Sequence, residues 1–187
     1  MVKKNSCVFI SGTGSNLKAL IQSSRRYNFP INIKLIVSNK KNALGLIFAK
    51  KYAIPFKIIN TEKNLFEVEL INEMNRKKIS LICLAGYMKI LSKNFINSYK
   101  GKIINIHPSL LPKYKGTNTF SRILADREKR AGCTVHFVNE KLDSGRIILK
   151  KSFEIVGDEN VRTLRNKTQR KEYTAFSEAI TKLYMSY

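Results

Sequence analysis

The sequence is poor in the residues that build disulfide frameworks and metal sites. Its 187 residues include three cysteines, two histidines and no tryptophan. The cysteines Cys7, Cys83 and Cys133 are odd in number and far apart, and there is no CxxC pair and no Cys/His cluster with metal-ligand spacing. Cys7 and Cys83 lie inside apolar runs, where a free thiol packs as a small hydrophobic group. We therefore predict buried, inert thiols and no metal site.

Long apolar runs are missing as well. No segment approaches the roughly 20 apolar residues of a membrane span. The apolar run after the charged start covers only Cys7–Ile10, which is too short for the core of a signal peptide. These absences predict a cytoplasmic protein without a membrane partner. The hydrophobic fraction of 43% is typical of a globular chain, and the length suits one domain with its own core.

Acidic residues are scarce, with 13 Asp and Glu against 35 Lys and Arg, for a formal net charge of +22. A basic protein invites nucleic acid as a partner. However, the basic residues are spread along the whole chain, without a polybasic tail and without an RNP, KH or zinc-finger signature. This pattern favours a generally basic surface that attracts anionic small molecules, with a nucleic acid as the alternative partner.

Apolar runs and helical periodicities alternate along the chain. The pattern predicts strands over 6–11, 31–38, 56–59, 80–85, 102–106, 134–138 and 146–153, and helices over 16–26, 43–52, 65–77, 95–99, 119–126 and 159–184. Such alternation is typical of an α/β fold with a doubly wound, mostly parallel sheet and helices on both faces. Ligands of such sheets bind beyond the carboxyl ends of the strands.

A glycine-rich turn over residues 11–16 (SGTGSN) follows the first predicted strand and opens the first predicted helix. A helix start offers free N–H groups and the positive end of the dipole, so a phosphate can bind at Gly14, Ser15 and Asn16. The turn is not a P-loop, and Leu17 stands where the dinucleotide fingerprint has its third glycine. A plain turn that caps a helix is the alternative.

The end of the strand over 102–106 carries the most informative residues. Asn105 and His107 are two apart, so their side chains point to the same side, and an amide beside an imidazole suits a developing oxyanion. Asp143 follows a later strand and can orient His107, although turns often contain an Asp for local reasons. His136, inside an apolar strand, is interpreted as a structural residue.

Five segments together resemble the phosphoribosylglycinamide formyltransferases, the folate-dependent formyltransferase family of purine synthesis. They are SGTGSNL (11–17), VSNKKNALGL (37–46), LAGYMKIL (84–91), INIHPSLLPKYKG (104–116) and GCTVHFVNEKLDSGRII (132–148). Methionyl-tRNA formyltransferase and formyltetrahydrofolate deformylase share parts of this pattern but have further domains. The resemblance implies one Rossmann-like formyltransferase domain over 1–187, with a phosphate-binding half up to about residue 100 and a catalytic and folate-binding half after it.

The resemblance also implies roles for individual residues and a co-substrate. The implied catalytic residues are Asn105, His107 and Asp143; the implied contacts to phosphoribosylglycinamide are Gly14, Ser15, Asn16 and Glu172; the implied folate contacts are Lys63, Met88, Lys89, Ile90, Leu91 and Asn105. The co-substrate would be 10-formyltetrahydrofolate, without a metal, and the partners would be small molecules. A monomer and a homodimer are both compatible with the sequence.

The chain departs from the family pattern at several positions. They are Lys89 in place of Arg, Lys115 and Arg146 in place of Pro, Ser144 in place of Gly, and Asn118 and Phe120 where the loop often has His. We expect a weaker folate contact at Lys89 and a looser loop around 115–120. Two alternative functions are formyl transfer to a charged tRNA and RNA binding by a basic Rossmann-like protein.

Overall fold

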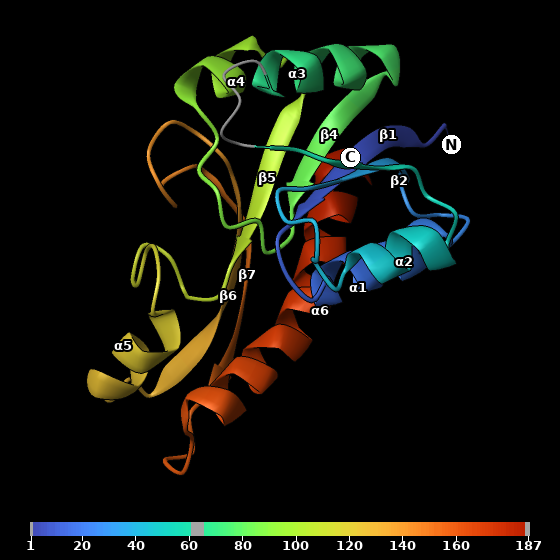
Figure 1. The fold of residues 1–187 in the computed structure, drawn as a ribbon. Helices are drawn as coiled ribbons and strands as arrows, with labels where there is room; N and C mark the ends of the chain where they lie inside the picture. The colour runs from blue at the N-terminus through green and yellow to red at the C-terminus, as the bar shows by residue number, and fades with distance from the viewer. Residues whose placement is uncertain (1, 61–65, 186–187) are drawn as a thin grey trace. The chain divides into compact units, whose positions relative to one another are not determined.

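The structure is a computed structural model that describes residues 2–60 and 66–185. Seven strands and six helices lie in the described residues, and most of them alternate along the chain (Figure 1). The chain divides into two compact units, Met1–Ile104 and Asn105–Tyr187. This division lies near residue 100, where the sequence predicts the boundary between two functional halves; the roles of these halves stay predictions.

The first unit contains a parallel sheet in the order β3-β2-β1-β4. Its strands are β1 (Lys4–Ile10), β2 (Ile31–Ser38), β3 (Phe56–Ile58) and β4 (Ile79–Leu84). Val8, Phe9, Ile36 and Ile82 are fully buried. Strands that are covered on both faces read as continuous apolar runs, which is why the sequence marks them so clearly.

The helices of this unit are α1 (Ser15–Ser24), α2 (Leu46–Lys51), α3 (Phe66–Arg76) and α4 (Lys93–Ser98). The chain moves outward from β1 through β2 to β3 and then returns to β4 beside β1. Because parallel crossovers are right-handed, the return through α3 covers the face opposite to α1 and α2. The strand order therefore reverses between β1 and β4, and ligands of open α/β sheets bind at such a point.

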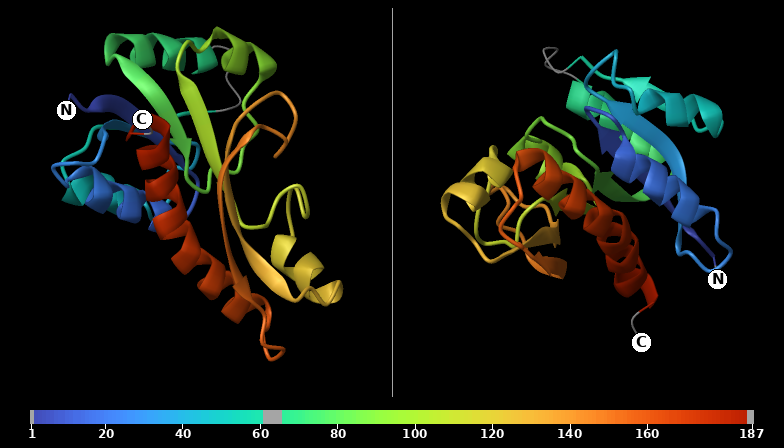
Figure 2. Two further views of the ribbon diagram at one scale, coloured as in Figure 1. Left: turned by 180° about the vertical axis from the view of Figure 1, so that it is seen from behind. Right: turned by 90° about the horizontal axis from the view of Figure 1, so that it is seen from below.

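The second unit contains an antiparallel pair and a long helix. β5 (Lys102–His107) begins in the first unit and ends in the second, followed by α5 (Thr119–Ala125), β6 (Arg130–Phe137), β7 (Ile147–Glu154) and α6 (Val161–Met185). β6 pairs with β7, and α6 packs along both (Figure 2). Leu164, Phe176 and Ile180 are the apolar anchors of α6 and are buried.

Element boundaries differ from the predictions where local contacts decide them. The predicted helix over 43–52 begins only at Leu46. The residue before it, Gly45, lies directly against the backbone of Gly14, and a side chain on either glycine would block this contact. The tail helix begins at Val161 because the Asn160 side chain caps it: its Oδ1 accepts hydrogen bonds from the N–H groups of Arg162 and Thr163. Ser92 caps α4 by accepting from the Phe95 N–H at 3.0 Å, so this helix begins at Lys93, two residues before the predicted start.

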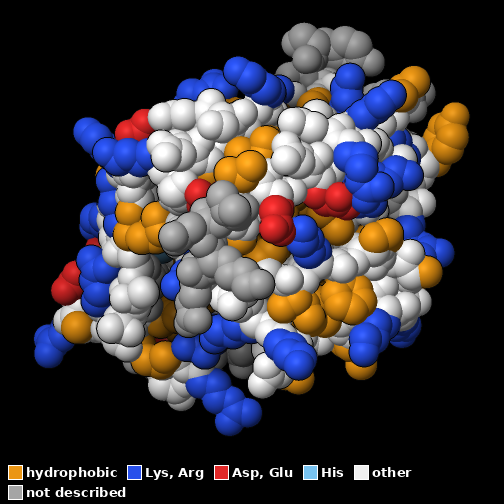
Figure 3. All heavy atoms as spheres, turned by 45° about the horizontal axis from the view of Figure 1, so that its top comes forward, with side chains coloured by type: hydrophobic (Ala, Val, Ile, Leu, Met, Phe, Trp, Pro, Cys, Tyr) orange, Lys and Arg blue, Asp and Glu red, His pale blue; other side chains and the backbone are white. Residues whose placement is uncertain are grey.

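Lysine and arginine side chains cover much of the face drawn in Figure 3, with few acids between them, as the composition predicts. In the described part of the chain, no helix is both long enough and apolar enough to cross a membrane. The three cysteines are buried and free, in agreement with the prediction of core thiols.

Candidate active site

The glycine turn of the first unit is built by close packing between two backbones. Gly14 has φ +72°, and a Cβ on it would lie 2.5 Å from the Cα of Gly45. The Gly45 N–H donates to the Gly12 carbonyl at 3.0 Å, which fixes the two turns to each other. Both the left-handed backbone and the close approach require glycine at position 14.

This turn leaves the start of α1 open to an anion. Gly14 stands at the N-cap position without a side-chain hydrogen bond to the helix, and the first turn contains no acidic residue. Ser15 begins the helix and Asn16 is buried beside it. The N–H groups and the dipole of this ten-residue helix therefore attract negative charge, in keeping with the phosphate site predicted at Gly14, Ser15 and Asn16.

The segment after β4 is tied to the same turn. The buried Ser11 hydroxyl donates to Asn39 Oδ1 at 2.6 Å and accepts from the Met88 N–H at 2.8 Å. The side chains of Met88 and Ile90 are 73% and 77% exposed, whereas Leu91 is buried. Two of the predicted folate contacts thus present apolar surface, and Leu91 anchors the segment. Lys89 is exposed, and Lys63 lies outside the described residues.

The second unit brings the three predicted catalytic residues together. Asn105 and His107 extend from the end of β5, and Asp143 comes from the connection between β6 and β7. His107 Nδ1 lies 3.2 Å from Asp143 Oδ2, and Asn105 Nδ2 lies 3.5 Å from Asp143 Oδ1. His107 and Asp143 are 5% and 8% exposed. An amide, an imidazole and a carboxylate therefore share one nearly dry site.

Two local features hold Asp143 in this position. Its backbone has φ +45°, a left-handed conformation that Asp tolerates better than most residues. The Gly116 N–H donates to its Oδ2 at 2.9 Å. Gly145 lets the hairpin close, because a Cβ there would lie 1.7 Å from the Phe137 carbonyl oxygen. The turn that the sequence marks as LDSG is therefore shaped around this carboxylate.

Opposing effects set the charge of His107. Its Nε2 lies 2.8 Å from the Tyr114 carbonyl oxygen, and Nδ1 faces Asp143, so each ring nitrogen has an oxygen acceptor. Burial lowers the pKa of His107 below its ordinary value, although the Tyr114 carbonyl and the Asp143 carboxylate act against this. Since neutral and charged forms are each favoured by part of the environment, the ring is suited to exchange a proton.

Asp143 stays ionised in spite of its burial. Burial acts to raise the pKa of this carboxyl group, but the adjacent His136 ring, the hydrogen bond from the Gly116 N–H and the charge of His107 hold the pKa below its ordinary value. A carboxylate that remains charged in a buried site can orient an imidazole and stabilise its cation.

His136 belongs to this cluster, and its interpretation as a structural strand residue missed these contacts. Its Nδ1 lies 2.8 Å from the Phe137 carbonyl oxygen, which can only accept, so Nδ1 carries the proton. In the neutral ring Nε2 then accepts from Asn105 Nδ2, which lies 3.3 Å away; it also lies 3.6 Å from Asp143 Oδ1. The signal in the sequence was the spacing of two buried polar residues, Thr134 and His136, on one face of an apolar strand.

The loop after His107 has its own supports. Thr134 Oγ1 donates to the Ser109 carbonyl at 2.7 Å and accepts from the Leu111 N–H at 3.1 Å. The Tyr114 hydroxyl donates to the carboxylates of Asp126 and Glu128 at 2.7 and 2.8 Å. These contacts fix the backbone carbonyl that His107 faces.

Some of the departures from the family pattern lie in or next to this loop and have partners. Lys115 Nζ donates to Ser144 Oγ at 2.6 Å, so two unusual residues hydrogen-bond to each other. Phe120 packs against the buried cluster that contains Ile123, and the Arg165 guanidinium lies 5.7 Å from its ring centre. These contacts hold Lys115 and Phe120 in place, and the looser loop expected from the sequence stays a prediction.

Comparison with known proteins assigns the chain to a family. A family model described as "Formyl transferase" matches residues 4–180. The phosphoribosylglycinamide formyltransferase of Haemophilus influenzae is 39% identical over 177 residues, which cover 92% of this chain and 84% of the relative. The chain belongs to the formyl transferase family. The resemblance seen in its sequence is thereby confirmed.

Two further similar proteins concern the fold and the length of the relatives. The crystal structure of phosphoribosylglycinamide formyltransferase from Brucella melitensis matches with a TM-score of 0.93 and 35% identity, over 99% of this chain and 97% of that one. This likeness confirms the predicted α/β class. The "Trifunctional purine biosynthetic protein adenosine-3" of Drosophila melanogaster is 38% identical over 187 residues, but the chain spans only 14% of its length.

Glu172, the remaining predicted substrate contact, lies on α6 and is 8% exposed. Burial and the nearby charge of Glu172 raise the pKa of the Cys133 thiol to about 12. Within residues 2–60 and 66–185, no group of three His, Cys, Asp or Glu side chains is placed to hold a metal ion.

Proposed function

We propose that this member of the formyl transferase family moves the formyl group of 10-formyltetrahydrofolate to the amine of phosphoribosylglycinamide, a reaction of purine biosynthesis. The observation that carries the proposal is the convergence of Asn105, His107 and Asp143 in one nearly dry cluster. The names of the family members from Haemophilus influenzae and Brucella melitensis support the choice of acceptor.

In the proposed reaction, the acceptor amine forms a C–N bond to the formyl carbon, and negative charge develops on the formyl oxygen. Asn105 Nδ2 donates a hydrogen bond to this oxygen, because its contact with Asp143 is long and easily exchanged. His107 supplies a second donor when the oxygen replaces the Tyr114 carbonyl at Nε2. The bond between the formyl carbon and the folate nitrogen then breaks. The pair His107 and Asp143 takes the proton that the amine loses and delivers it to this leaving nitrogen.

The other proposed contacts follow from the surfaces described above. The start of α1 at Gly14, Ser15 and Asn16 would hold the phosphate, and Glu172 would contact the rest of the acceptor. The exposed side chains of Met88 and Ile90 offer apolar surface to the flat ring system of the folate. Lys89 lies in the same segment, and the proposed folate contact of Lys63 rests on the sequence alone.

The test is a formyl-transfer assay with purified protein, 10-formyltetrahydrofolate and phosphoribosylglycinamide. We expect turnover that falls by about 10²–10³ in Asn105→Ala and in His107→Ala, because each removes a donor to the oxyanion. Asn72→Ala, an exposed substitution on α3, is the control and should keep full activity. A folded protein without turnover, or a fully active His107→Ala, would contradict the proposal.

Formyl transfer to a charged tRNA and RNA binding by a basic Rossmann-like protein receive no support from the relatives named above. A cytoplasmic location and a monomeric or homodimeric state stay predictions.

A further inference from the structure

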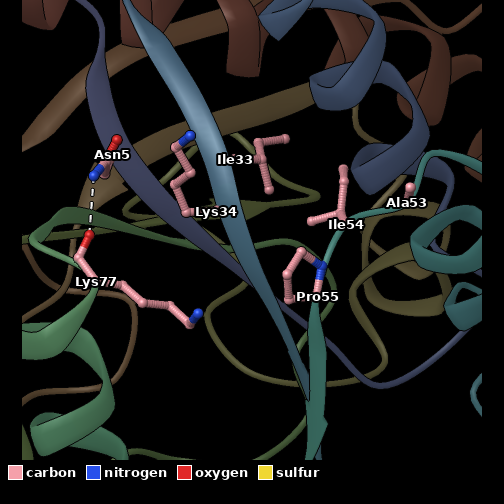
Figure 4. A pocket seen from close by; sticks show the side chains of 7 residues that line it. All are labelled: Asn5, Ile33, Lys34, Ala53, Ile54, Pro55 and Lys77. Atoms are coloured by element: carbon pink, nitrogen blue, oxygen red, sulfur yellow. Dashed lines mark hydrogen bonds between the residues drawn. The ribbon is translucent and has the colours of Figure 1, made fainter.

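The first unit contains a pocket of about 470 Å³ at the amino ends of its strands (Figure 4). It is lined by Asn5, Ile33, Lys34, Ala53, Ile54, Pro55 and Lys77. The glycine turn follows the opposite end of β1, and at a rise of about 3.3 Å per residue the two ends of this seven-residue strand are roughly 20 Å apart. The pocket is therefore separate from the proposed phosphate site at α1.

One wall of the pocket is apolar and rigid. Ala53 has φ +52°, and its N–H and that of Ile54 donate back to the carbonyls of Lys50 and Ala49, which is the Schellman ending of α2. The Pro55 carbonyl accepts from the Ile36 N–H at 2.9 Å. The backbone of this wall is thus held by hydrogen bonds at three successive residues, so the hollow exists before any ligand binds.

The opposite side carries positive charge, as the side chains in Figure 4 show. Asn5 Nδ2 donates to the Lys77 carbonyl at 2.9 Å, which ties the end of α3 to β1. The acid beside Lys77 is Glu73, but both its oxygens already accept from Arg76 at 2.8–3.0 Å, and the Lys77 ammonium lies farther away at 3.4 Å. Lys77 therefore keeps most of its capacity to bind an anion.

Lys34 adds a second cation to this side. Across the described part of the chain, its side chain makes no hydrogen bond and no ion pair with another residue. It is exposed, next to the buried Ile33, on the wall of the pocket. Two ammonium groups, of which only that of Lys77 has an acid nearby, and a preformed apolar wall are complementary to a ligand with an anionic end and a flat apolar end.

From this arrangement we infer a second ligand site, which takes a small organic phosphate with a flat ring, of the size of a nucleoside monophosphate. The phosphate lies between Lys34 and Lys77, and the ring lies on Ile54 and Pro55. The volume lies within the range of about 300–1,000 Å³ that is typical of small-molecule sites. The site is independent of the catalytic cluster and of the proposed function.

The test follows backbone amide shifts by NMR during titration of the protein with adenosine monophosphate. We expect saturable shifts at Lys34, Ile54 and Lys77, and weaker binding of both adenosine and inorganic phosphate, because each lacks one half of the ligand. Lys34→Gln and Lys77→Gln should each weaken binding by roughly three- to tenfold. Lys150→Gln, an exposed lysine of β7, is the control and should bind like the unchanged protein.

A matched pair at Ala53 separates charge from shape. Asn and Asp have nearly the same size, and both tolerate the left-handed backbone of this position. Ala53→Asp should therefore weaken binding of adenosine monophosphate clearly more than Ala53→Asn does. Equal binding by both variants, shifts confined to Gly14–Asn16, or inorganic phosphate binding as tightly as the nucleotide would each overturn the inference.

Discussion

At the scale of single residues, the site depends on where protons reside. His107 lies between two oxygen acceptors, while the tautomer of His136 is set by the Phe137 carbonyl. Asp143 contacts both rings and the Asn105 amide. One carboxylate thus fixes the orientation of three other polar groups, so changes to it should affect catalysis more than folding.

We predict that Asp143→Asn lowers kcat by about 10²–10³ while the protein remains folded. The amide keeps the size of the carboxylate but removes the charge that stabilises the His107 cation. The measurement is steady-state formyl transfer at several acceptor concentrations, with thermal unfolding as the control for folding. A variant with normal kcat would exclude Asp143 from the proton path.

His136 should act as a positioning residue rather than as a catalytic one. We predict that His136→Gln, which keeps a side-chain acceptor near Asn105, retains more kcat than His136→Ala, which leaves the amide without its partner. The expected loss for Ala is about tenfold, in line with one hydrogen bond of roughly 1–1.5 kcal/mol. If Gln and Ala reduce kcat equally, the ring does not act through the Asn105 amide.

The direction of the His107 shift gives a prediction for stability. A lowered pKa means that the unfolded chain binds this proton more readily than the folded protein, so stability falls as the pH drops below the ordinary value of 6.5. We expect urea unfolding to show a larger loss of stability between about pH 7.5 and about pH 5.5 in the unchanged protein than in His107→Gln. Equal losses would mean that the burial of His107 does not control its charge.

At the scale of elements, the contact between Gly14 and Gly45 links the helix start of α1 to that of α2. Gly45 has φ −61°, which any residue adopts, but a Cβ there would lie 2.8 Å from the Gly14 Cα and 2.9 Å from Ile10 Cδ1. We predict that Gly45→Ala costs about 1–3 kcal/mol of stability and raises KM for the phosphorylated acceptor more than it lowers kcat. Urea unfolding measures the loss of stability, and steady-state kinetics measure KM and kcat separately. An unchanged KM would separate this turn from phosphate binding.

The sequence predicted most elements because their signals are local. Buried parallel strands such as β1 and β4 read as apolar runs in the sequence. The late start of α2 could not be predicted, because it depends on a contact between turns that are far apart in the chain. The same reason hid the contacts of His136, whose partners come from β5 and from the turn at Asp143.

At the scale of the whole molecule, the net charge of +22 follows directly from the sequence, but the sequence does not reveal what this charge is for. Most of the 35 lysines and arginines cannot have an acidic partner of their own, because the chain has only 13 acidic residues. Such an excess creates a positive potential that attracts anionic ligands before they touch the site. The proposed acceptor carries a phosphate, so its capture should depend on this potential.

We therefore predict that KM for phosphoribosylglycinamide rises as salt increases, whereas kcat stays nearly constant. The screening length falls from about 30 Å at 0.01 M to about 10 Å at 0.1 M, so long-range attraction is lost while the buried hydrogen bonds of Asn105, His107 and Asp143 are little affected. Lys150→Gln, which removes one exposed charge, should change KM only slightly because many charges share the effect. A KM that is independent of salt would mean that the basic surface does not attract the acceptor. RNA binding would then be measured at several salt concentrations, because counterion release makes such binding weaken steeply as salt increases.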